Sequence, residues 1–333
     1  MRAAPLPPVV EHLPILILYP HSRCNCRCVM CDIWKTDRSD EIAVAEMERH
    51  LAHIRLLETR WVVFSGGEPL MHSDLFRLSA LLRREGIRTT LLSTGLLLER
   101  YARRVAESLD EVIVSLDGPP EIHDRIRRVP RAYELLAAGV VALRAYDAQF
   151  PISARSTIQR LNHAHLVETI CAAKKLGLNS ISFLAADVTS AAFNRALVWP
   201  LERQNEVALA AEEVPALESQ IEALIRANDP LVLESPEKLR RIVRHFKAHL
   251  GLDTHQAPRC NAPWVSAVME ADGTLRPCFF HAPVGNVREQ SLAGALNSDA
   301  ARTFRANLDV ASDPTCRRCV CSLHWDSERA ARR

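Results

Sequence analysis

Six short apolar segments alternate with longer amphipathic segments between residues 13 and 186. The short segments are rich in Val, Ile, Leu, Ser and Thr, which is typical of strands buried on both faces of a parallel sheet. The alternation therefore predicts an α/β fold, and this number of repeats favours a partial or full (β/α) barrel. The expected strands are Ile15–Tyr19, Trp61–Ser65, Thr89–Ser93, Val112–Leu116, Ile152–Ile158 and Ile181–Ala185. The expected helices are Ala43–Glu58, Asp74–Glu85, Leu98–Ser108, Ala132–Ala145 and Leu166–Leu176.

The C-terminal part of the chain has a different character. Residues 190–255 are polar and helical in period, which predicts two or three linking helices. A hairpin from Val265–Met269 to Leu275–Pro277 and a helix over Leu292–Leu308 follow, with too little apolar mass for an independent core. We therefore expect a metal to stabilise this part. The predicted division is 13–188 barrel, 189–255 helical linker, 256–326 cluster-binding domain and 327–333 basic tail.

The charge balance excludes several classes of protein. Lys and Arg total 42 and Asp and Glu total 40, so the formal net charge is +2. A balance this even predicts no nucleic-acid partner. Basic doublets such as Arg83-Arg84, Arg127-Arg128 and Arg317-Arg318 are scattered along the chain, and are interpreted as solvated faces. No apolar run reaches the roughly 20 residues that a membrane span needs, so we expect no membrane partner.

Ten cysteines are the outstanding feature of the composition, and nine of them fall into two groups. Clustered thiols in a reducing compartment predict metal or iron–sulfur ligands, and we expect a cytoplasmic protein. Cys171 stands alone in an apolar helical pattern, which predicts a small core residue. The groups are Cys24, Cys26, Cys28 and Cys31, and Cys260, Cys278, Cys316, Cys319 and Cys321.

The first group contains a C-x3-C-x2-C pattern directly after the first expected strand. Three thiolates from Cys24, Cys28 and Cys31 would leave one iron of a 4Fe–4S cluster open to a ligand. The alternative is a structural zinc site whose fourth ligand is Cys26, His21 or a residue elsewhere in the chain. Gly66-Gly67-Glu68-Pro69 follows the second strand, where ligands of parallel α/β folds bind. Two glycines allow close backbone approach to a ligand, and Glu68 with nearby carbonyls can accept hydrogen bonds from an ammonium group.

Together these motifs resemble the radical S-adenosylmethionine (radical SAM) superfamily, from about residue 13 to 326. The resemblance implies a partial (β/α)6 TIM-like barrel with a small C-terminal cluster-binding domain made of a β-hairpin and a helix. It implies that Cys24, Cys28 and Cys31 hold a 4Fe–4S cluster with an open site, which SAM chelates. It also implies that Gly66 to Pro69 bind the SAM amino group, with a side chain at either glycine expected to block SAM. Cys26 lies outside the family pattern.

Further positions match the family more loosely. Leu92-Ser-Thr-Gly95 ends the third strand in the manner of the family's Ser/Thr-Asn-Gly turn, which places Thr94 at the cofactor. Ser115-Leu-Asp-Gly118, with His123-Asp124-Arg125 after it, resembles the fourth-strand motif that faces SAM and substrate. The resemblance thus places Ser115 and Asp117 on the active-site face. The cofactor-binding candidates are Gly66, Gly67, Glu68, Pro69, Thr94, Ser115, Asp117, Thr157 and Asn162, and the catalytic candidates are Asp117 and Arg155.

The second cysteine group resembles the twitch form of the SPASM auxiliary-cluster domain. The shared features are a Gly-x4-Cys hairpin at Gly273 and Cys278, and a closing C-x2-C. The resemblance implies an auxiliary 4Fe–4S cluster held by Cys260, Cys278, Cys316 and Cys319, with Cys321 as an alternative ligand. A structural zinc held by four thiolates remains the alternative.

The implied activity is that of an oxidoreductase. The resemblance implies reductive cleavage of SAM to a 5′-deoxyadenosyl radical, which abstracts hydrogen from substrate. We expect the substrate to be a small, polar biosynthetic molecule that is oxidised or rearranged, with the auxiliary cluster as electron acceptor and an external donor such as flavodoxin or ferredoxin. The alternative is a maturase that modifies a precursor peptide. An iron–sulfur electron carrier or a zinc-stabilised binding protein is the competing class, against which Gly66-Gly67-Glu68-Pro69 argues.

Overall fold

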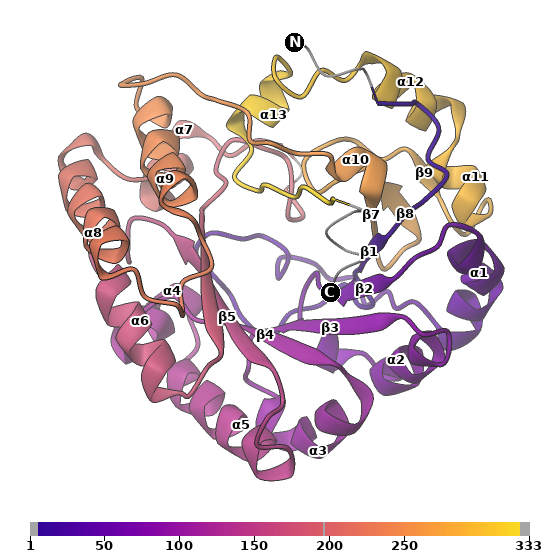
Figure 1. Cartoon of the computed structure of the whole chain (residues 1–333), viewed down its shortest axis with the longest axis horizontal. Helices are drawn as coiled ribbons and strands as arrows, with labels where there is room; N and C mark the ends of the chain where they lie inside the picture. Colours follow the sequence, from indigo (N-terminus) through magenta and orange to yellow (C-terminus); the bar gives the residue numbers. More distant parts are fainter. Residues whose placement is uncertain (1–5, 196, 327–333) are drawn as a thin grey trace.

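The computed structural model describes residues 6–195 and 197–326, so the predicted basic tail at 327–333 lies outside the described residues. Its centre is one curved sheet with the strand order β6-β5-β4-β3-β2-β1-β7-β8-β9 (Figure 1). The first six strands are parallel, and β1 has β2 on one side and β7 on the other. These six are β1 (Ile15–Leu18), β2 (Trp61–Phe64), β3 (Arg88–Ser93), β4 (Glu111–Ser115), β5 (Ile152–Ile158) and β6 (Ser180–Ala185).

Helices cover the outer face of the parallel strands, as Figure 1 shows. They follow the strands in βα order, so that each helix buries its apolar side against the sheet. Gly86 and Gly177 adopt positive φ directly after α2 and α6, as expected of residues that end helices. The helices are α1 (Val44–Leu56), α2 (Leu75–Arg84), α3 (Leu98–Ser108), α4 (Pro120–Arg127), α5 (Ala132–Tyr146) and α6 (Leu166–Lys175), with the 3-10 turn η1 (Pro69–Met71) after β2.

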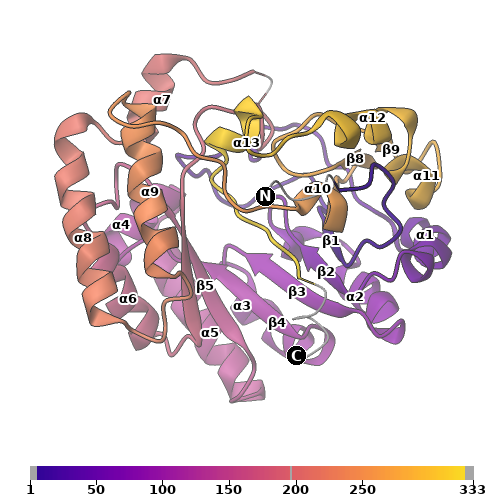
Figure 2. The same cartoon turned by 45° about the horizontal axis from the view of Figure 1, so that its top comes forward.

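The sheet does not close into a barrel among the described residues, because β6 and β9 are its two edges. Figure 2 shows α8 and α9 lying along the outer flank of the sheet near α6. This linking segment contains α7 (Leu201–Val207), η2 (Ala211–Glu213), α8 (Val214–Ala227) and α9 (Pro236–His249).

The C-terminal segment continues the main sheet. Strand β7 pairs in parallel with β1, from Ile15 opposite Ser266 to Leu18 opposite Met269, and then forms an antiparallel hairpin with β8. The apolar residues Leu275, Leu292 and Leu296 of this C-terminal segment belong to the same buried cluster as the strands of the barrel. The elements are α10 (Ala262–Val265), β7 (Ser266–Met269), β8 (Thr274–Arg276), β9 (Gly285–Asn286), α11 (Leu292–Leu296), α12 (Asp299–Asn307) and α13 (Pro314–Arg318).

The partial-barrel prediction is confirmed, and all six expected strands lie within one residue of their observed ends. The expected helix over Leu292–Leu308 is two helices, because Ser298 caps a new one through its hydroxyl. Helix α4 was not predicted. The core position predicted for Cys171 is wrong, because this residue is exposed on α6. The domain limits at 188 and 255 stay predictions, and within the described residues no helix is long and apolar enough to cross a bilayer.

Candidate active site

The carboxyl ends of β1 to β6 surround a cavity of about 230 Å³. We call it the cysteine cavity, because thiols from both ends of the chain line it. The lining combines the predicted cysteines with residues from the ends of five further strands, β2 to β6. Those used below are Cys24, Cys28, Cys31, Gly66, Gly67, Thr94, Ser115, Arg127, Arg155, Thr157 and Cys321.

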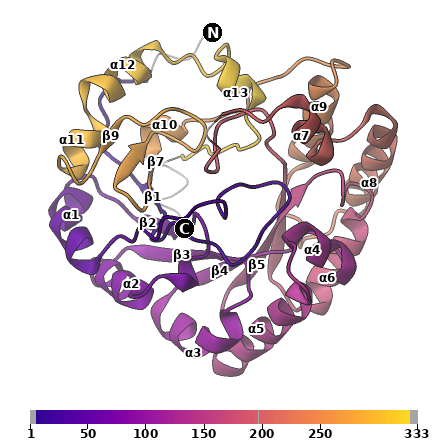
Figure 3. The same cartoon turned by 180° about the vertical axis from the view of Figure 1, so that it is seen from behind.

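The loop after β1 carries the first cysteine group across these strand ends (Figure 3). It is fixed to the last turn of α4, where the backbone N–H groups of Arg27 and Val29 donate to the carbonyls of Arg127 and Ile126, both at 3.1 Å. The indole of Trp34 donates to the carbonyl of Cys31 at 2.8 Å. These bonds satisfy loop backbone groups that would otherwise be unpaired, and so hold the three thiols at one end of the sheet.

The thiols of this loop suit a soft metal centre. Burial raises the pKa of Cys24 and of Cys31 to about 12, while a hydrogen bond with Cys26 lowers the pKa of Cys28 to about 7. Buried thiolates are stable only beside positive charge, and a bound metal centre supplies it. Cys24, Cys28 and Cys31 line the same cavity, and a donor set of three thiols fits an iron–sulfur cluster with one iron left without a protein thiolate.

The Gly66-Gly67 turn packs against the cysteine loop itself. Gly66 has φ +93°, and a Cβ there would lie 2.6 Å from the Tyr19 ring; a Cβ at Gly67 would lie 1.9 Å from the backbone oxygen of Arg23. Both positions thus require glycine because the turn packs closely against the protein's own chain. This requirement adds to the one expected from the sequence, that the backbone must approach SAM closely.

Replacing Gly67 with alanine should therefore disturb the cysteine loop as well as any SAM site. We expect the variant to bind less iron and to lose about 2 kcal/mol or more of stability, because the backbone next to Cys24 must move. Iron content and the denaturation midpoint measure both effects. Gly86→Ala is the control: it has φ +75° but open space around its Cβ, and should cost only about 1 kcal/mol with normal iron. Normal iron in Gly67→Ala would contradict this packing account.

Glu68 acts as a buried brace between two strand ends. Its carboxylate is fully buried and accepts hydrogen bonds from the backbone of Leu70 at 3.0 Å, from the Ser93 hydroxyl and from Thr94. Burial raises its pKa, while the bonds from Thr94 and Leu70 oppose that rise. With its oxygens used in this way, Glu68 fixes the Gly66-Gly67 turn and Thr94.

Asp117 lies behind the cavity wall. It is fully buried, forms an ion pair with Arg127, and accepts a 2.8 Å hydrogen bond from the backbone of Thr157. It is absent from the cavity lining, whereas Arg127 lines it. Asp117 thus stands behind Arg127, and its predicted role at SAM or substrate stays a prediction. The solvated position predicted for Arg127 is wrong, because this residue is only 7% exposed.

The remaining candidates divide in the same way. Ser115, Thr157 and Arg155 line the cavity, and the Arg155 Nε donates to Ser182 at 3.3 Å. Asn162 is fully buried and does not line it. Its amide donates to the carbonyls of Asp117 at 2.9 Å and Thr157, so Asn162 holds the cavity wall together.

The second cysteine group gathers where β8, α13 and the last described residues meet. Burial raises the pKa of Cys278 to about 11, with Cys260 and Cys321 adding to the rise. A contact between the thiols of Cys319 and Cys321 raises the pKa of Cys319 and lowers that of Cys321. Mutual thiol contacts of this kind fit a thiolate-held metal centre.

Charged and polar groups surround this second group. The Arg241 guanidinium of α9 donates to the carbonyl of Cys319 at 3.1 Å and to that of Val320 at 3.2 Å. The imidazole Nε2 of His281 lies 3.4 Å from the Cys316 sulfur. The ligand atoms of His281, Asp313 and Cys316 all lie within 4.8 Å of one another. Arg241 of α9 thus holds the backbone around Cys319 from outside, while α13 carries Cys316 itself.

Cys321 connects the two cysteine groups, because it lines the cysteine cavity together with Cys24, Cys28 and Cys31. It is also close enough to Arg155 for the guanidinium to lower its pKa, after the larger effect of Cys319. Residues almost 300 positions apart in sequence thus share one cavity wall.

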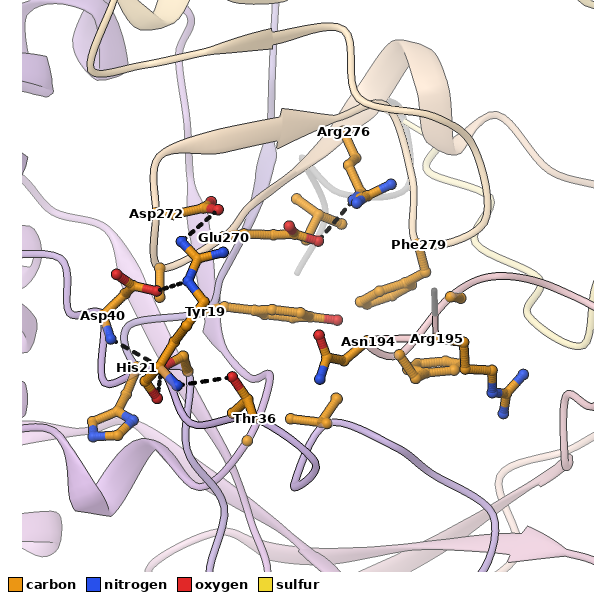
Figure 4. A pocket seen from close by; sticks show the side chains of 18 of the residues that line it. Tyr19, His21, Thr36, Asp40, Asn194, Arg195, Glu270, Asp272, Arg276 and Phe279 are labelled. Carbon is orange, nitrogen blue, oxygen red and sulfur yellow. Dashed lines mark hydrogen bonds and ion pairs between the residues drawn. The ribbon is translucent and has the colours of Figure 1, made fainter. Parts of the chain in front are cut away.

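A second cavity of about 290 Å³ adjoins the first, and shares Ile33, Gly67 and Phe193 with it. Figure 4 shows the rings of Tyr19 and Phe279 side by side along it. Their centroids are 6.2 Å apart with 27° between the planes, and Phe193 stands in the same relation to Phe279.

The charged groups of the second cavity are paired. Arg276 bonds to Glu270 at 2.7 Å, and Arg38 bridges two carboxylates, Asp40 at 2.7 Å and Asp272 at 3.1 Å (Figure 4). The cavity therefore offers an aromatic wall with polar groups at one end, which suits a ligand that is partly apolar and partly polar.

Comparison with known proteins places this geometry in a family. A sequence profile described as the Radical SAM superfamily matches residues 18–184, and one described as an iron–sulfur cluster-binding domain, SPASM, matches residues 260–320. The chain belongs to the radical SAM superfamily and carries a SPASM-type C-terminal domain, with the 4Fe–4S cluster, SAM and auxiliary iron–sulfur centre that these imply.

Particular relatives are similar over most of the chain. The AdoMet-dependent heme synthase of Methanosarcina barkeri is 26% identical over 80% of this chain and 77% of its own. The PqqA peptide cyclase of Rhizobium meliloti is 27% identical over 91% of this chain and 78% of its own. The crystal structure of Streptococcus suis SuiB bound to precursor peptide SuiA has a TM-score of 0.65 at 13% identity, covering 95% of this chain and 72% of that one, and so shares the fold.

Several site residues were missed from sequence. Tyr19 was assigned to a strand, and Phe193 and Phe279 were not singled out; neither their spacing nor their type marks them. Arg127 carried one usable signal, since it follows the Ser115–Gly118 and His123–Arg125 motifs by a few residues.

Proposed function

We propose that the chain is a radical SAM enzyme that abstracts hydrogen from a small, polar biosynthetic molecule and oxidises it, with the auxiliary 4Fe–4S cluster as electron acceptor. The observation that carries this proposal is the position of Cys321, a C-terminal thiol on the wall of the cavity that Cys24, Cys28 and Cys31 also line. An electron acceptor can serve a substrate only if it stands near the place where hydrogen is removed.

The first three cysteines would hold the cluster, and Gly66 to Pro69 with Thr94, Ser115 and Thr157 would hold SAM. When bound, the reduced cluster and SAM supply a 5′-deoxyadenosyl radical that removes hydrogen from an unactivated C–H bond. Glu68 orients the Gly66-Gly67 turn, and Asn162 and Asp117 fix the cavity wall behind it. Arg155, exposed on that wall, is the candidate to contact substrate, whereas Asp117 acts through Arg127.

Cys260, Cys278, Cys316 and either Cys319 or Cys321 would hold the auxiliary cluster. Four thiolates make a closed centre suited to taking up an electron. We further propose a cytoplasmic location, where clustered thiols stay reduced, and an external reductant such as flavodoxin or ferredoxin.

The second cavity is the proposed substrate site. It lies between Gly67 of the SAM turn and Phe279, which directly follows Cys278. Its occupant would thus lie between the two metal centres, with its flat apolar part on Phe193, Tyr19 and Phe279. The relative named as a heme synthase supports a small molecule. The relative named as a peptide cyclase, which aligns with more of the chain, supports peptide modification as the second candidate.

The reduced, reconstituted full chain can be given SAM with either a filtrate of small metabolites or a peptide fraction from the same cells. The proposal predicts that the filtrate raises 5′-deoxyadenosine formation above the background without substrate. A rise with peptides alone would replace it by the maturase alternative, and no rise with either would contradict both.

The aromatic wall gives a prediction for the same assay. Replacing Phe279 with leucine should lower substrate-stimulated 5′-deoxyadenosine formation by about tenfold, since one aromatic contact contributes roughly 1 kcal/mol or more. Cleavage of SAM without substrate should be unchanged. Phe280→Leu is the matched control, because Phe280 is the adjacent ring but lines neither cavity. Equal loss in both variants would show that the effect is structural.

A further inference from the structure

Arg127 is a buried charged group whose surroundings imply more than a structural role. Its guanidinium lines the cysteine cavity, with a side chain only 9% exposed. One terminal nitrogen lies 3.6 Å from the sulfur of Cys28, and the other forms the ion pair with Asp117. The third nitrogen, Nε, is buried without a hydrogen-bond partner among the described residues.

We propose that Arg127 sets the reduction potential of the first cluster by donating a charge-assisted hydrogen bond to the Cys28 sulfur, and that Asp117 limits this effect. The proposal rests on the assignment of Cys28 as a cluster ligand. Arg127 is a positioning residue in this account, because it acts on the cluster through Cys28.

The fold holds Arg127 in place from both sides. Its own carbonyl accepts from the Arg27 backbone, so the residue is tied to the cysteine loop at main-chain level. On the other side, Asp117 is held by the backbone of Thr157 and by Asn162. The guanidinium of Arg127 stays charged, because arginine is not deprotonated in proteins and this one is paired with the Asp117 carboxylate.

The direction of the effect follows from charge. A cation and a hydrogen bond at a ligating sulfur stabilise the cluster state that carries the extra electron, and so raise the reduction potential. The Asp117 carboxylate, which pairs with the other terminal nitrogen of Arg127, opposes this with its negative charge. Removing the two groups one at a time should therefore move the potential in opposite directions.

The test is a redox titration of the reconstituted full chain, followed by electron paramagnetic resonance in the absence of SAM. The signal of the first cluster is identified beforehand as the one that changes when SAM is added. We expect a lower potential for Arg127→Met and a higher one for Asp117→Asn, with the auxiliary cluster unshifted. Arg160→Met is the matched control, since Arg160 pairs with Glu213 at 2.9 Å and lines neither cavity, and should leave both potentials unchanged.

Two outcomes would overturn the proposal. Unchanged potentials in both variants would limit Arg127 to binding SAM or to packing, and shifts in the same direction would indicate general loosening of the loop. If Arg127→Met does not take up the first cluster, Arg127→Lys is the deciding variant, because lysine keeps the charge without the planar guanidinium. We expect Arg127→Lys to lower the reduction potential by a smaller amount, and an unchanged potential would contradict the proposal. Full iron in Cys28→Ala would instead refute the ligand assignment, independently of the titration.

Discussion

Replacing Cys24, Cys28 and Cys31 together with alanine should abolish 5′-deoxyadenosine formation and remove half of the iron. We expect about eight irons and eight sulfides per chain before the change and about four of each after it, because two 4Fe–4S clusters are implied. The expected loss of activity is complete, since these three thiols are the proposed ligands that hold the cluster beside Gly66 and Gly67 in the cysteine cavity.

Cys171→Ala is the control for this experiment, because Cys171 is an exposed thiol outside both groups. It should keep all of the iron and the activity. Full iron in the triple variant would contradict the assignment of the first group. Stoichiometric zinc in an anaerobic preparation would contradict the cluster assignment of the second group.

Removing the auxiliary cluster should spare SAM cleavage but reduce the formation of oxidised product. We expect a variant with Cys316 and Cys319 replaced by alanine to cleave SAM but to form little oxidised product. The substrate would still lose hydrogen, but its electron would have no acceptor. The ratio of 5′-deoxyadenosine to product measures this directly, and should rise several-fold or more.

These two cysteines are the best choice, because they lie on α13 and just after it, outside the buried cluster that joins the C-terminal segment to the sheet. Circular dichroism and the signal of the first cluster establish that the rest of the chain is intact. A ratio equal to that of the unmodified enzyme would reject the electron-acceptor role and leave a structural one.

The strands of the sheet could be predicted from sequence because each is marked by a local pattern. This pattern is an apolar run of strand length between two amphipathic helical segments. Helix α4 could not, since its eight residues are mostly polar and begin at Pro120. The pairing of β7 with β1 joins segments about 250 residues apart, and no local pattern encodes such a contact. The prediction of a C-terminal segment without a core of its own is consistent with its sharing the main core.

Residues of the candidate site also differ in how far a local sequence pattern could predict them. Cys24 to Cys31 and Gly66 to Pro69 are contiguous motifs, so their spacing together with their resemblance to radical SAM enzymes singled them out. Asp117 was placed on the cavity face by its motif, but the side chain turns into the wall and Arg127 takes its place there. Whether a polar residue lines a cavity or braces it depends on packing from other segments, which a single sequence does not display.

The most direct test of the central claim is 5′-deoxyadenosine formation from SAM by the anaerobically reconstituted and chemically reduced full chain. The account predicts 5′-deoxyadenosine and methionine in equal amounts, with a further rise when substrate is supplied. Intact SAM in a chain that carries both clusters in the reduced state would contradict it.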